Sequence, residues 1–199
     1  MFGTEHKRFR ILMVPGLHDS GLQHWQTRWQ QYEPRFERVE QEHWDVPDLL
    51  SWSARIGSTL RRSARGSVIV AHSFGCLAAL HCAATSARNL HGLFLVAPAD
   101  PERFGLGAAL RSLRLERPAT LVASRNDPWM DADAAAWWAR QWGADFIDAG
   151  ALGHINADSG IGDWPQGAAL FEVLLARIPT PRCACNSQPD ADGETRPAA

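Results

Sequence analysis

The 199-residue chain is predicted to fold as a single α/β domain, with a mostly parallel sheet and helices on both faces. Short runs of apolar residues alternate along the chain with longer amphipathic segments. The short runs are continuously apolar, as expected of parallel strands buried on both faces. The length suits one domain with a sizeable core. We expect that domain over residues 1–178, followed by a disordered tail, 179–199, in which apolar residues become scarce.

The first third of the chain predicts two strands and two helices. Residues 9–14 form an apolar run, typical of a buried strand, that ends at a Pro-Gly pair. Apolar side chains recur at helical spacing across residues 22–32, and Pro34 ends that helix. Residues 36–40 are a weaker strand. Residues 49–64 predict a helix with apolar side chains on one face and arginines on the other.

The middle of the chain continues the alternation. Residues 68–70 are β-branched and predict a buried strand, and a small, apolar helix follows from residue 76 to about residue 87. Residues 90–97 predict the next buried strand. Residues 100–114 mix Pro, Gly and Arg with apolar residues, which indicates a loop and a short helix.

The last third predicts the remaining elements. Residues 119–124 form a strand, and residues 131–142, rich in Ala and Trp, form a helix. Residues 146–148 are a short last strand. Residues 149–164 form a Gly-rich loop, and residues 165–177 form a helix that begins with Pro, a favoured residue at that position.

The sharpest motif is Ala71-His72-Ser73-Phe74-Gly75, between a strand and a helix with no room for an ordinary loop. Such a tight turn presents the side chain at its apex, and small neighbours let strand and helix approach closely. Ser73 is therefore the candidate nucleophile of a G-x-S-x-G-like elbow, with Ala71 in place of the first Gly. The alternative is that Ser73 only caps the helix.

A serine nucleophile needs a general base and an acid that orients it, and on this fold they follow in the order Ser, Asp or Glu, His. His154 is the one histidine beyond the later strands, in the loop after the last of them. Asp127 follows the strand before it, so we predict Asp127 as the acid, with Asp100 as its rival. The backbone N–H groups of Leu17 and Phe74 are the candidate oxyanion donors.

Further side chains are predicted to line the pocket: His18, His24, Trp25 and Trp129. For His24 and Trp25 the alternative is a helix face that packs on the sheet. The chemistry requires no metal or organic cofactor. Cys183 and Cys185 form a C-x-C pair in the tail, which is no metal site without other ligands.

Composition narrows the possible binding partners and the possible location of the protein. The formal net charge of −2 and the absence of a basic face argue against nucleic-acid binding. The polar first ten residues are unlike a signal peptide, and no apolar run is long enough to span a bilayer. Cysteine usage, with Cys76 and Cys82 expected as buried thiols, suits a reducing cytoplasm. The nine Trp residues are expected mostly in the core and the pocket.

Several motifs together resemble one family. They are Val14-Pro15-Gly16, Ser20-Gly21 before His24-Trp25-Gln26 and Trp29, the A-H-S-F-G elbow, Ser124-Arg125-Asn126-Asp127-Pro128, and Gly153-His154-Ile155-Asn156 with Ser159-Gly160 and Trp164-Pro165. The chain resembles the small, lidless serine hydrolases related to retinoblastoma-binding protein 9, within the α/β-hydrolases. The resemblance spans about residues 9 to 178. It implies the triad Ser73, Asp127 and His154, about six strands, and no large cap domain.

These observations predict a serine hydrolase that cleaves small carboxylic esters, with amides as a second candidate substrate class, through an acyl-enzyme. The alternative is a protein-interaction module on a hydrolase fold with weak or vestigial catalysis. A dehalogenase would place a carboxylate at the elbow, so Ser73 excludes that chemistry. The natural substrate and any protein partner are not indicated by the sequence.

Overall fold

The computed structural model describes residues 2–85 and 88–179. Six strands form one sheet in the order β2-β1-β3-β4-β5-β6, and every neighbouring pair is parallel. The strands are β1 (Arg10–Val14), β2 (Glu37–Arg38), β3 (Ser67–His72), β4 (Leu90–Val96), β5 (Ala119–Ala123) and β6 (Asp145–Asp148). The predicted α/β fold is confirmed. Residues 180–199, which make up almost all of the predicted tail, lie outside the described residues.

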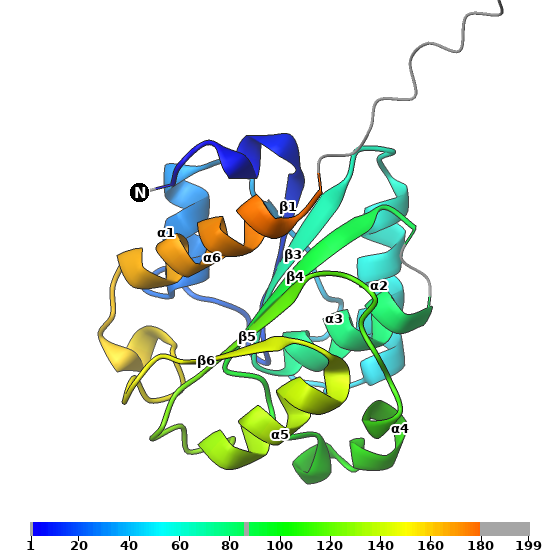
Figure 1. Ribbon diagram of the computed structural model, residues 1–199, viewed down its shortest axis with the longest axis vertical. Coiled ribbons are helices and arrows are strands. Elements are labelled where there is room, and N and C mark those ends of the chain that lie inside the picture. The colour runs from blue at the N-terminus through cyan, green and yellow to red at the C-terminus, as the bar shows by residue number, and fades with distance from the viewer. Residues whose placement is uncertain (1, 86–87, 180–199) are drawn as a thin grey trace, which may run out of the picture.

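Helices cover both faces of the sheet (Figure 1). They are α1 (Trp25–Tyr32), α2 (Leu49–Arg61), α3 (Phe74–Thr85), α4 (Gly107–Arg111), α5 (Ala132–Trp142) and α6 (Pro165–Arg177). Helices α1 and α6 pack on one face in a core that includes Trp25, Trp29 and Phe171. Helices α2, α3 and α5 pack on the other face around Trp52, Leu77 and Trp142. Both faces of the central strands are therefore apolar and buried, as the sequence indicates.

Short 3-10 helices supplement these elements: η1 (Glu5–Arg8), η2 (Pro101–Phe104) and η3 (Ala157–Ser159). Segment 100–114 contains η2 and α4, in agreement with the predicted loop and short helix. No large cap domain covers the carboxyl edge of the sheet within residues 2–85 and 88–179 (Figure 1).

Helix α1 begins three residues later than predicted. The N–H of His24 donates to the carbonyl of Gly21 at 2.9 Å, so residues 21–24 form a turn. Leu22 is consequently 74 % exposed and does not belong to the buried stripe. His24 caps the helix, because its Nδ1 accepts from the N–H of Gln26. Ser, Thr, Asp and Asn are the usual caps, so a capping histidine is difficult to predict from sequence.

Candidate active site

Ser73 stands alone between β3 and α3, with φ of +53°. Few residues other than glycine adopt this left-handed conformation. A serine that merely caps a helix has extended backbone instead. The strained turn is therefore that of an elbow which presents the Ser73 side chain at the carboxyl edge of the sheet.

The elbow packs directly on the turn after β1. A Cβ atom on Gly75 would lie 2.3 Å from the carbonyl oxygen of Pro15, and one on Gly16 would lie 2.7 Å from Cβ of Ser73. Only glycine fits at either position without a shift of the backbone. Ala71 is fully buried, and its methyl group is accommodated where the motif usually has glycine.

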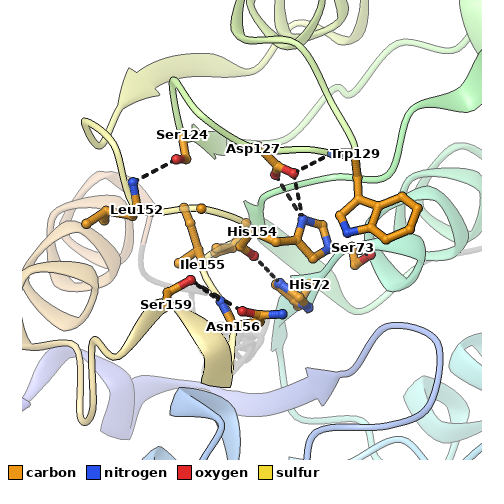
Figure 2. Close-up of polar contacts among 12 residues, drawn as sticks. His72, Ser73, Ser124, Asp127, Trp129, Leu152, His154, Ile155, Asn156 and Ser159 are labelled. Atoms are coloured by element: carbon orange, nitrogen blue, oxygen red, sulfur yellow. Dashed lines mark hydrogen bonds and ion pairs between the residues drawn. The ribbon is translucent and has the colours of Figure 1, made fainter.

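The structure brings the three predicted catalytic side chains together (Figure 2). Nε2 of His154 lies 3.0 Å from Oγ of Ser73. Nδ1 of His154 lies 2.9 and 3.0 Å from the two carboxylate oxygens of Asp127. Their side chains are only 11 % and 2 % exposed. These three residues come from the ends of three strands, in the order that the sequence indicates.

The contacts define how protons are arranged in this group. The Asp127 carboxylate only accepts hydrogen bonds, so the imidazole Nδ1 donates to it and carries the proton of the neutral ring. Nε2 is left with a lone pair that faces the Ser73 hydroxyl. The backbone N–H of Trp129 also donates to Asp127, at 2.9 Å, which fixes the carboxylate. The arrangement can remove a proton from Ser73 and stabilise the imidazolium that results.

Two polar side chains after β5 join the acid loop to the base loop. Oγ of Ser124 accepts from the N–H of Leu152 at 2.8 Å, and Oδ1 of Asn126 accepts from the N–H of Gly153 at 2.7 Å. The sequence does not predict these two roles. Ser124 and Asn126 appeared only within the S-R-N-D-P motif, whose contacts depend on a loop that is distant in sequence.

The candidate oxyanion donors come from two segments next to the nucleophile, the start of α3 and the turn after β1. Phe74 is the first residue of α3, so its N–H has no acceptor within the helix. Leu17 lies beside Ser73 in the turn after β1. That turn is held by the N–H of His18, which donates to the carbonyl of Trp44 at 2.8 Å. His18 and Asp19 both have positive φ, so the turn is tightly wound.

A cleft of about 320 Å³ opens above Ser73 and His154. It is lined by Leu17, His18, Ser73, Ala99, Asp100, Arg103, Phe104, Trp129, His154, Asn156 and Asp158. His18 and Trp129, two of the residues predicted to line the pocket, are among the residues that line this cleft. Trp129 is 55 % exposed, and the Arg103 guanidinium lies 5.9 Å from its ring. Asp100, the rival acid, instead caps η2, because its side chain accepts from the N–H of Glu102.

The prediction that His24 and Trp25 line the pocket is corrected by the structure. Both are buried, at 5 % and 0 % exposure, because the cap and the first residue of α1 are packed toward the sheet. His24 and His72, here called the buried histidine pair, have ring centroids 4.7 Å apart behind the elbow. Burial, with Arg38 and His154 nearby, lowers the pKa of His24 to about 3. Burial also lowers the pKa of His72 well below its ordinary value.

Within residues 2–85 and 88–179, no three His, Cys, Asp or Glu side chains gather as a metal site would require. Over the same residues, no helix has the length and apolar character needed to cross a bilayer. Cys76 and Cys82 are buried, as expected, and neither forms a disulfide.

A parallel sheet with a strand–serine–helix elbow, and with Asp and His at the same edge, defines the α/β-hydrolase class. More narrowly, the family model described as "Serine hydrolase" matches residues 11–173. The chain belongs to this serine hydrolase family. No match is found among curated proteins.

Solved structures agree with this placement. A YdeN-like hydrolase from Pectobacterium atrosepticum is 35 % identical, with a TM-score of 0.84 over 88 % of this chain and 95 % of that chain. The ydeN gene product from B. subtilis is 19 % identical, with a TM-score of 0.67 over 84 % and 98 % of the two chains. The esterase RhEst1 from Rhodococcus sp. is 11 % identical, with a TM-score of 0.62 over 85 % of this chain and 90 % of that chain. The last two likenesses concern the fold alone.

Proposed function

We propose that this serine hydrolase cleaves small carboxylic esters, with amides as a second candidate substrate class, through an acyl-enzyme formed on Ser73. The observation that carries the proposal is the continuous chain of hydrogen bonds from Asp127 through His154 to Ser73. This chain ends in an open cleft, where a carbonyl group can approach the hydroxyl.

In the first half-reaction, Nε2 of His154 takes the proton of Ser73 as Oγ bonds to the carbonyl carbon. The N–H groups of Leu17 and Phe74 donate to the resulting oxyanion, and one such donor contributes about 3 to 4 kcal/mol to transition-state stabilisation. The imidazolium then gives its proton to the leaving alcohol as the bond to carbon breaks. Asp127 keeps the imidazole oriented and stabilises its charged form.

In the second half-reaction, water replaces the alcohol. His154 takes a proton from the water as its oxygen bonds to the acyl carbon, and Ser73 leaves with the proton that the imidazolium returns. Every proton moves between protein groups, substrate and water. The proposed steps therefore use no metal ion and no organic cofactor.

The volume of the cleft suits a small substrate. Its volume of about 320 Å³ lies at the lower end of the range for ligand pockets, about 300 to 1,000 Å³. Leu17, Phe104 and Trp129 supply an apolar surface for an acyl or alkoxy group. The motifs described above favour membership among the retinoblastoma-binding protein 9-like hydrolases. The two buried cysteines form no disulfide, which suits the reducing cytoplasm in which we place the protein.

The test is covalent labelling with a fluorophosphonate probe, together with hydrolysis of p-nitrophenyl esters of graded acyl length. We expect the wild type to be labelled and Ser73→Ala to be unlabelled and inactive. Activity is expected to be highest for short acyl chains. A folded wild type that neither reacts with the probe nor cleaves any ester would refute the enzyme and favour the interaction module.

A further inference from the structure

The general base is held at its backbone as well as at its ring. The carbonyl oxygen of His154 accepts a hydrogen bond from Nε2 of His72 at 2.9 Å, while its imidazole contacts Ser73 at 3.0 Å (Figure 2). His72 and Ser73 are consecutive residues of the elbow. Two consecutive residues therefore contact the same histidine, one at its backbone carbonyl and the other at its ring.

The loop that carries His154 needs such anchors. Ile155, the next residue, is fully buried and has φ of +45°, a conformation that is costly for a β-branched residue. Strained backbone of this kind persists only where the surroundings enforce it. The indole N–H of Trp25 donates to the carbonyl of Ile155 at 2.8 Å, and His72 donates to the carbonyl just before it.

The surroundings of His72 suit a neutral donor. Its side chain is only 5 % exposed, and it is absent from the cleft lining given above, so it lies behind the elbow. Because a carbonyl oxygen only accepts, the His72 ring must carry its proton on Nε2. The His24 ring lies against it, and its own Nδ1 is occupied by the N–H of Gln26 at 3.2 Å. His24 is thereby fixed and limits the rotation of His72.

We propose that His72 is a positioning residue that sets the distance between the general base and the nucleophile; this inference rests on the proposed function. Its N–H ties the His154 backbone to the strand end that bears Ser73. Without that bond the loop moves relative to the elbow, and a displacement of about 1 Å can lower the rate by about 10²-fold. The cleft keeps its lining, so substrate binding is largely preserved.

The experiment compares His72→Leu, which removes the donor, with His72→Gln, which keeps an N–H at a similar reach. We expect His72→Leu to lower kcat by about tenfold or more, with KM within about twofold of the wild type. His72→Gln should recover most of kcat. The matched control is His81→Leu, which removes a histidine hydrogen bond of 2.8 Å to Ser53 on the α2–α3 side, and should leave kcat unchanged.

The outcomes separate the inference from the proposed function. If the wild type hydrolyses esters and Ser73→Ala does not, but folded His72→Leu retains full kcat, only the positioning role is overturned. Equal losses in His72→Leu and His72→Gln would also overturn it. If His72→Leu does not fold, ¹⁵N NMR of the wild type shows which ring nitrogen of His72 carries the proton. A neutral His72 protonated on Nε2 supports the inference, and one protonated on Nδ1 refutes it.

Discussion

Gly16 lies in the turn after β1, where a single added methyl group would press on the proposed nucleophile. In Gly16→Ala the new Cβ would start 2.7 Å from Cβ of Ser73, whereas ordinary van der Waals contact begins at 3.4 Å. The two carbons must therefore separate by about 0.7 Å. The same methyl would lie 3.3 Å from Oγ of Ser73. The substitution thus changes the spacing between the nucleophile and the turn that carries the Leu17 N–H.

A displacement of this size is expected to lower kcat/KM by about 10- to 100-fold, which corresponds to about 1.4 to 2.7 kcal/mol of transition-state stabilisation. The loss should fall on kcat more than on KM, because the oxyanion exists only in the transition state. The assay is steady-state hydrolysis of a short p-nitrophenyl ester, with the rate of fluorophosphonate labelling as a second measure.

Gly21→Ala is the matched control, since a Cβ at Gly21 meets nothing within 4 Å and the residue is exposed. It should keep the wild-type rate. If Gly16→Ala retains the wild-type kcat/KM while Ser73→Ala is inactive, the close packing of the turn on the nucleophile does not govern the reaction, and the reasoning is refuted.

Further predictions address the acid, the buried histidine pair and the loop contacts. Asp127→Asn should lower kcat by about 10³-fold or more, because the imidazole loses the group that fixes its tautomer. The control, Asp133→Asn at an exposed position, should keep the wild-type kcat. An Asp127→Asn variant with wild-type kcat would contradict the triad. The buried histidine pair has lowered pKa values in the folded state, so the unfolded chain binds more protons below pH 6.5. The free energy of unfolding, measured with urea, is expected to be greatest above that pH. It should fall by about 1.4 kcal/mol per pH unit for each histidine ring as the pH drops. An unfolding free energy that does not change between pH 6.5 and 5 would exclude this linkage. Ser124→Ala removes the acceptor of the N–H of half-buried Leu152 and should cost about 1 kcal/mol in unfolding free energy. An unchanged urea midpoint would count against this contact.

The sequence alone determined the class of fold and the three candidate catalytic side chains. Apolar runs alternate with amphipathic segments, and burial of those runs on both faces allows few arrangements besides a parallel sheet. Once the sheet is parallel, the ends of its strands meet at one edge. The order of Ser73, Asp127 and His154 along the chain then suffices to bring them together, because each follows a strand whose direction is known.

Only the tertiary structure decided which neighbours hold these side chains in place. His24 and Trp25 are residue types that often line pockets, yet the orientation of the start of α1 buries both of them behind the elbow. The bond from His72 to His154 joins residues 82 positions apart. Such contacts depend on backbone angles in loops, among them the positive φ of Ile155, and on the packing of two layers. Periodicity in the sequence reports which face of an element is apolar, but it does not report which loop atom that face will meet.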